Sequence, residues 1–214
     1  MYSRGLESYK ISEVKEALMM LGRAGLIQEV LMSSANGLPL GAETNPKFRK
    51  FLFLDPGLML RIQGLDMGGG KMMEEFILSA SKSDLVNKGA LAEMFVGLEL
   101  IKNGNPRIRE NLYYWENLNR GASAEVDYLS VFNMKVLPIE VKSGVSGKMK
   151  SLRMFMENKS LHTAIRTSLE NFGRIQFGNS KVPTSDKNDG EFTINIIPLY
   201  AIYNYLNILQ SSSL

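Results

Sequence analysis

The chain has 214 residues, 44% of them hydrophobic and 22% charged, which is the composition of a globular protein with a packed core. It contains no cysteine and one histidine, His162, so disulfides, thiolate metal sites and multi-histidine sites are excluded, and carboxylate and carbonyl oxygens remain as metal ligands. The net charge of +3 is too small to indicate a partner by itself, and the sequence has neither an apolar run of about 18 residues nor a secretion signal, which predicts no membrane partner and a cytoplasmic location.

The first part of the sequence predicts a helix followed by two strands. Residues 12–23 place apolar side chains at helical spacing, and residues 26–32 and 48–55 have the pattern of strands. This order predicts a small winged-helix-like unit over residues 1–62. The helix of such a unit can contact DNA, but winged-helix units serve equally often as protein-contact or packing units. Its basic residues available to phosphates are Lys15, Arg23, Lys47, Arg49 and Lys50.

The glycine-rich stretch that follows predicts a linker and not a nucleotide-binding loop. Five residues separate Gly64 from Gly70, which is one too many for the phosphate-binding loop, and Met72 occupies the position of its magnesium-binding hydroxyl. We therefore expect a linker over residues 63–86 and an α/β domain over residues 87–214.

The second half of the chain predicts a mixed sheet with flanking helices. In chain order the expected elements are a helix at 88–103, extended runs at 111–117, 123–133 and 135–144, a helix at 148–160, a strand at 162–168, an exposed loop at 178–190, and a strand running into a helix over 191–210. The second and third extended runs are expected to form an antiparallel hairpin through a turn near Asn133.

Both strands of this hairpin carry charged residues between apolar ones. In the first strand Glu125 and Asp127 share one side, and in the second strand Glu140 and Lys142 share one side. If these sides coincide, Asp127, Glu140 and Lys142 converge. Two carboxylates held together repel each other until a hard divalent cation binds between them, and a neighbouring lysine can orient a water molecule or offset charge on phosphorus.

An ion-pair ladder on the hairpin surface explains the same spacing equally well. Two features favour a site: the apolar neighbours of the acids, and the basic segment that begins beside them. Between Lys135 and Lys181 the chain has nine Lys and Arg residues against three Glu residues, an excess that attracts polyanions or forms a solvated basic surface.

Asp127 followed by Glu140-Val141-Lys142 resembles the PD-(D/E)xK motif of restriction-endonuclease-like nucleases, with Val126 in place of proline as in Holliday-junction-resolvase-like relatives. The resemblance implies a magnesium or manganese ion held by Glu93, Asp127 and Glu140, with Lys142 positioning the attacking water. Glu93 would come from the preceding helix, with Glu99 as the second choice, although a solvated helix residue explains Glu93 as well. The residues expected to hold DNA phosphates are Lys148, Lys150, Arg153 and Arg166.

A second resemblance covers most of the chain. The segments "ALMMLGRAGLI", "PLGAETNPKFRKFLFLDPGLM", "GALAEMFVGLEL", "LYYWEN", "AEVDYLSV" and "PIEVKSG", in this order, are similar to the C-terminal part of prokaryotic AAA-type ATPases, catalogued as a domain of unknown function. This implies a winged-helix segment and a nuclease-like domain, normally preceded by an ATPase module. The sequence has no Gly-Lys-Ser/Thr loop, so ATP hydrolysis is not expected of these residues.

The sequence thus predicts a restriction-endonuclease-like α/β protein that cleaves DNA with magnesium. The alternative is a non-catalytic module that binds DNA or protein and serves an ATPase in cis or in trans. Geometry separates the two, because carboxylates that lie far apart or are plugged by a neighbouring side chain would favour the alternative.

Overall fold

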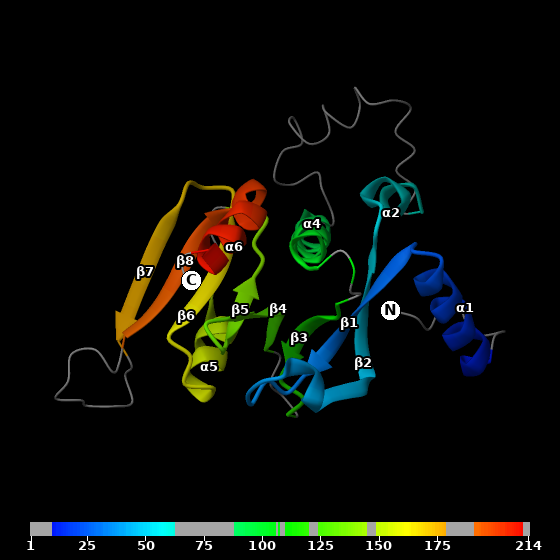
Figure 1. Cartoon of the computed structure of the whole chain (residues 1–214), viewed down its shortest axis with the longest axis horizontal. Coiled ribbons are helices and arrows are strands. Elements are labelled where there is room, and N and C mark those ends of the chain that lie inside the picture. The colour runs from blue at the N-terminus through cyan, green and yellow to red at the C-terminus, as the bar shows by residue number, and fades with distance from the viewer. Residues whose placement is uncertain are drawn as a thin grey trace, which may run out of the picture.

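An eight-stranded mixed sheet organises the chain (Figure 1). The computed structural model describes residues 10–62, 88–105, 107, 110–119, 124–144, 149–178 and 191–211. The strand order in the sheet is β2-β1-β3-β4-β5-β6-β8-β7. The strands are β1 (Ile27–Ser33), β2 (Thr44–Phe53), β3 (Leu112–Glu116), β4 (Glu125–Phe132), β5 (Lys135–Glu140), β6 (Thr163–Ser168), β7 (Gly173–Gly178) and β8 (Glu191–Pro198).

Helices flank this sheet on both faces. The helices are α1 (Ile11–Arg23), α2 (Pro56–Ile62), α4 (Lys88–Asn103), α5 (Lys150–Asn158) and α6 (Ile202–Ser211), with short 3-10 turns at η1 (Leu40–Glu43) and η2 (Leu199–Ala201). Residues of α4 and α6 pack with one hydrophobic cluster of the sheet, and residues of α5 pack with a second cluster. The predicted α/β class with a mixed, helix-flanked sheet is therefore confirmed.

The two N-terminal strands belong to the same sheet as the second half of the chain. β1 pairs antiparallel with β2 and parallel with β3, where Val30 lies opposite Leu112. The predicted order of helix, strand and strand is present, but the strands continue the main sheet. The predicted linker at 63–86 lies outside the described residues, so the boundary at residue 62 stays a prediction.

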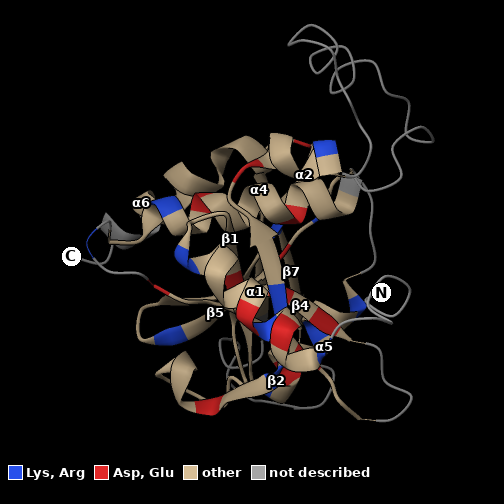
Figure 2. Cartoon of the chain, turned by 90° about the vertical axis from the view of Figure 1, so that its right-hand side faces the viewer, with Lys and Arg blue, Asp and Glu red and all other residues tan. Residues whose placement is uncertain are grey.

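The apolar side chains of the helix α1 contribute no buried residue to the core. None of its residues is buried, and Met19 and Met20 are among its exposed side chains. Figure 2 shows acidic and basic residues side by side on this helix, where Glu13 and Glu16 accompany Lys15 and Arg23. Acidic residues among the basic ones weaken the attraction of this helix for a phosphate backbone.

The predicted β4–β5 hairpin is confirmed. Tyr128 lies opposite Ile139 in an antiparallel register, and the turn residues Asn133 and Met134 have positive φ angles of 49° and 57°. Positive φ at both central residues is the conformation of the two-residue turn that matches the twist of the strands. The hairpin therefore holds its two charged strand ends in a defined register.

One glycine lets α4 approach the sheet closely. A Cβ atom at Gly97 would lie 2.4 Å from Leu52 Cδ1 and 2.6 Å from the Tyr128 hydroxyl. The same Tyr128 hydroxyl donates a hydrogen bond to the carbonyl of Glu93 at 2.8 Å, one turn earlier in the helix. This contact places Glu93 over the hairpin.

Two elements, α2 and β7, were not predicted from the sequence. The helix α2 starts after Asp55, whose side chain accepts a hydrogen bond from the Gly57 N–H at 2.7 Å. The short strand β7 pairs with β8 at the edge of the sheet and has glycine at both ends, which weakens its strand signal. The predicted exposed loop at 178–190 lies almost entirely outside the described residues.

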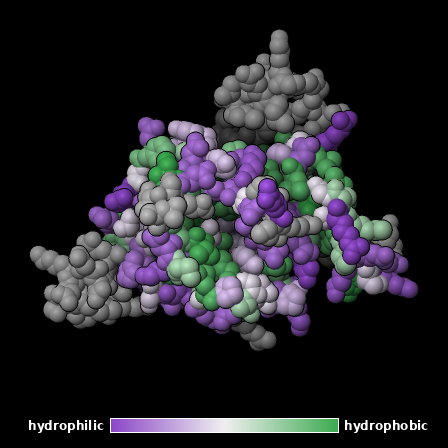
Figure 3. Space-filling model, in the orientation of Figure 1, coloured by the Kyte–Doolittle hydropathy of each residue, from purple (hydrophilic) through white to green (hydrophobic). Residues whose placement is uncertain are grey.

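None of the helices within the described ranges combines the length and apolar character needed to cross a membrane. On the face shown in Figure 3, hydrophobic residues form separate patches within a largely hydrophilic surface.

Candidate metal centre

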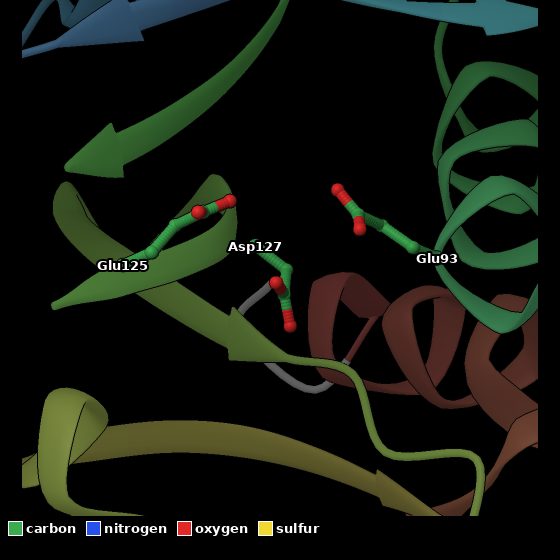
Figure 4. A group of neighbouring side chains, drawn as sticks. All are labelled: Glu93, Glu125 and Asp127. Carbon is green, nitrogen blue, oxygen red and sulfur yellow. The ribbon is translucent and has the colours of Figure 1, made fainter. Parts of the chain in front are cut away.

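Three carboxylates from one helix and one strand meet beside the hairpin. Glu93 comes from α4, and Glu125 and Asp127 come from β4; one carboxylate oxygen of each lies within 4.8 Å of the others. Figure 4 shows Glu93 and Glu125 directed toward each other, with Asp127 beside them. Glu125 and Asp127 share a side of β4 because side chains alternate along a strand, with the fully buried Val126 between them.

Asp127 is fixed by the neighbouring strand. Its Oδ2 accepts a hydrogen bond of 2.6 Å from the N–H of Val141, the residue after Glu140, and the adjacent register pair of the hairpin is Tyr128 with Ile139. Burial and, after it, the charges of Glu140 and Glu93 together raise the pKa of Asp127 to about 7, against the lowering effects of the Val141 N–H and of Lys50. Asp127 thus has a proton that it can exchange for a cation near neutral pH.

Glu140 and Lys142 form a second pair next to this cluster. The Lys142 Nζ lies 2.5 Å from the Oε1 of Glu140, and Glu140 is only 5% exposed. The Oε2 of Glu140 is buried and has no hydrogen-bond partner among the described residues. Burial raises the pKa of Glu140, while its bond with Lys142 lowers it. A buried carboxylate oxygen without a partner is costly unless a ligand satisfies it.

The cluster has Glu125 where the sequence analysis expected Glu140. Glu93 and Asp127 come together as expected, whereas the third carboxylate of the group within 4.8 Å is Glu125. Glu140 interacts electrostatically with both Asp127 and Glu125, so it adjoins the cluster. Glu99, the second choice for the helix acid, is paired with Lys102 at 2.6 Å and is not part of the cluster.

A lysine that the sequence analysis considered only as a phosphate contact lies within the cluster. The Lys50 ammonium contacts Glu93 at 2.8 Å and also contacts Glu125. It lies 4.7 Å from the centre of the Tyr114 ring. Burial alone would lower the pKa of Lys50, but the charges of Glu93 and Glu125 more than compensate, and the pKa is raised. Lys50 comes from β2, which β1 and β3 separate from β4 in the sheet, so no local pattern could reveal this contact.

The residues expected to hold phosphates lie in different environments. Lys150 and Arg153 are exposed on α5, and the Arg153 guanidinium lies 4.5 Å from the Phe177 ring centre. Arg166 is only 4% exposed and pairs in register with Glu140 on the neighbouring strand, so it adds charge to the site rather than to the surface. Lys148 lies outside the described residues.

The donor set fits a hard divalent cation. Carboxylate oxygens are the ligands that magnesium and manganese prefer, and oxygens within 4.8 Å of one another can share an ion at distances of roughly 2.0–2.6 Å. The buried Oε2 of Glu140 adds an oxygen that needs a partner. The Lys50 ammonium already satisfies part of this set, through Glu93 and Glu125.

Comparison with known proteins identifies one family. A family model described as Domain of unknown function (DUF4143) matches residues 88–201. The matched segment includes the four acids and Lys142 but not Lys50. Comparisons with curated proteins and with solved structures found no match. Since the matched segment is more than half of the chain, the protein belongs to the DUF4143 family.

Proposed function

We propose that this centre hydrolyses phosphodiester bonds of DNA with a divalent metal ion. The observation that carries the proposal is the position of Asp127, which accepts a hydrogen bond from the Val141 N–H and interacts electrostatically with Glu140, while Lys142 is bonded to Glu140 and Glu93 approaches from the helix. This is the arrangement expected of a restriction-endonuclease-like domain, and the helix-flanked mixed sheet is consistent with such a fold. The winged-helix-like unit has less support, because β1 and β2 belong to the main sheet.

Each residue has a task that its position supports. Asp127 and Glu140 would hold a magnesium or manganese ion, with Glu93 next to them. The ion, when bound, supplies an activated water molecule and offsets negative charge on the phosphoryl group. The Lys142 side chain is more exposed than its partner Glu140, and its ammonium would orient that water. Lys150 and Arg153, which are exposed on α5, would hold the backbone phosphates.

A second candidate function is a non-catalytic module that binds DNA or protein and serves an ATPase in cis or in trans. The observation that favours it is the Lys50 ammonium, which neutralises Glu93 and Glu125 without a metal ion. A carboxylate cluster balanced by an internal lysine can be a structural ion-pair network.

Metal titration with DNA separates these candidates. Supercoiled, linear and branched DNA would be incubated with magnesium or manganese and the wild-type chain, Lys142→Ala or Glu140→Gln. We expect wild-type cleavage and a loss of about 100-fold or more in both variants, with unchanged circular dichroism. Glu99→Gln is the control, since Glu99 lies outside the cluster and should retain wild-type cleavage. A wild-type chain that is inert with every substrate and metal would favour the non-catalytic module.

A further inference from the structure

We infer that Lys50 is a permanent internal cation for Glu93 and Glu125, so that the centre binds one divalent ion, at Asp127 and Glu140, and not two. The inference rests on the proposed function for the ion at Asp127 and Glu140. The role of Lys50 at the other two acids rests on its own contacts.

Three groups from three elements hold the Lys50 ammonium. Glu93 on α4 and Glu125 on β4 both offer Oε1 to it, and the buried Tyr114 ring on β3 lies 4.7 Å away. The Lys50 side chain is 26% exposed, which distinguishes it from a solvated surface lysine. A lysine with two carboxylate partners and an aromatic face in contact is held more firmly than one in a single surface pair.

The other two acids keep oxygens for a different ligand. Asp127 is engaged through Oδ2 by the N–H of Val141, and Glu140 is engaged through Oε1 by Lys142. The Oε2 of Glu140 is buried without a hydrogen-bond partner among the described residues, and Glu140 interacts electrostatically with Asp127. A divalent ion can therefore use this pair without displacing Lys50.

The charges of the centre agree with one divalent ion. Four carboxyl groups face the ammonium groups of Lys50 and Lys142 and the guanidinium of Arg166, which pairs in register with Glu140. One divalent ion would change the net charge of these groups from slightly negative to slightly positive. A slightly positive centre attracts a singly charged phosphodiester. A second divalent ion beside Lys50 would add positive charge that no remaining acid of the cluster offsets. In two-metal sites the ions lie about 3.5–4 Å apart, and the Lys50 ammonium, held by Glu93 and Glu125, would take the place of the second ion.

The test is the number of manganese ions bound, measured by electron paramagnetic resonance and by isothermal titration calorimetry without DNA. We expect one ion for the wild-type chain and two for Lys50→Met, which keeps the apolar stem against Tyr114 but removes the charge. Lys47→Met, an exposed lysine on the same strand, is the matched control and should bind one ion. Lys50→Gln serves as a second variant should Lys50→Met fail to fold by circular dichroism.

Further substitutions assign the ions. In the Lys50→Met chain, Glu125→Gln should remove the added ion and Asp127→Asn the original one. Two ions in the wild-type chain, or one in both the wild-type and Lys50→Met chains, would overturn the inference while leaving the proposed function intact. If the wild type binds no ion and Lys50→Met binds one that depends on Glu125 but not on Asp127, the role of Lys50 is supported and the proposed function fails.

Discussion

Asp127 combines two opposing influences on its carboxyl group. The N–H of Val141 stabilises the ionised form, whereas burial and the nearby acids favour the protonated form and prevail. Ionisation of Asp127 therefore lowers the free energy of unfolding of the metal-free chain. A cation bound beside the carboxylate would offset this loss, as is common at functional sites.

This raised pKa predicts how stability depends on pH. The pKa of Asp127 is about 7 in the folded chain against an ordinary value of 3.8. Between these values the folded chain binds more protons than the unfolded chain, so the free energy of unfolding falls as pH rises and levels off above about pH 7. Burial raises the pKa of Glu140, which adds a contribution of the same sign.

Asp127→Asn removes the contribution of Asp127 and keeps an oxygen for the Val141 N–H. We would measure the free energy of unfolding by urea denaturation without metal. The difference between the variant and wild type should grow in favour of the variant by about 1–3 kcal/mol from pH 5 to pH 8. Glu16→Gln, exposed on α1, is the control and should follow the wild-type profile. A difference between Asp127→Asn and wild type that does not change with pH would contradict this account.

Three of the candidate site residues could be selected from the sequence because each belongs to a local pattern. Asp127, Glu140 and Lys142 follow from strand alternation and a two-residue turn, and both are local properties. Glu125 was visible on the same side as Asp127, but a motif with one acid in that strand gave no reason to select it. Lys50 was beyond prediction, since its contact with Glu125 spans 75 positions and depends on how the sheet and α4 pack.

At the scale of elements, the packing of α4 against the sheet decides where Glu93 lies. Gly97 faces Leu52 and the Tyr128 hydroxyl at distances that exclude a side chain. Glu93 is one turn away on the same face of the helix, because residues four apart are neighbours. Helix position and carboxylate position are therefore coupled.

Gly97→Ala should disturb both fold and site. The added methyl group would push α4 from the sheet and move Glu93 away from Lys50, and we expect a loss of about 1–3 kcal/mol in the free energy of unfolding, measured by urea denaturation. Gly89→Ala is the matched control in the same helix, since a Cβ atom there meets nothing within 4 Å. That variant should be neutral or up to about 1 kcal/mol more stable, because alanine favours the helix. Wild-type stability in Gly97→Ala would refute the coupling.

The elements recognised from the sequence are those with a strong period of their own. The helix α4 was predicted to its ends and the β4–β5 hairpin was recognised, although β5 ends at Glu140, four residues before its predicted end. The strand β7 was missed because its glycines and exposed side chains give little hydrophobic pattern. The order of strands in the sheet was not predictable in detail. The parallel pairing of β1 with β3 joins segments about 80 residues apart, and no local preference encodes it.

For the whole molecule, the strands before residue 88 complete the sheet of the DUF4143 segment. β1 covers the edge of β3, and Val30 and Leu52 contribute buried side chains to the cluster that contacts α4. By contrast, α1 buries no residue. The two N-terminal parts should therefore differ in how much the fold depends on them.

Two truncations test this difference. A chain that begins at residue 24 lacks α1 and should keep the oligomeric state of the full chain, with a melting temperature within about 4 °C of wild type. A chain that begins at residue 88 lacks β1 and β2, exposes the unpaired edge of β3, and should aggregate or fail to unfold cooperatively. Light scattering after size-exclusion chromatography and thermal melts would show this. A monomeric, cooperatively folded chain from residue 88 onward would mean that the family segment stands alone.

The contact between Lys50 and its acids has a consequence for the chain during synthesis. Lys50 leaves the ribosome 43 residues before Glu93 and 75 residues before Glu125. The neutralising ammonium is therefore already present when each acid emerges, so the carboxylates need not wait for a cellular ion before they are brought together. Closing such long loops is slow, and docking of the late hairpin onto the early strands should be the step that limits maturation.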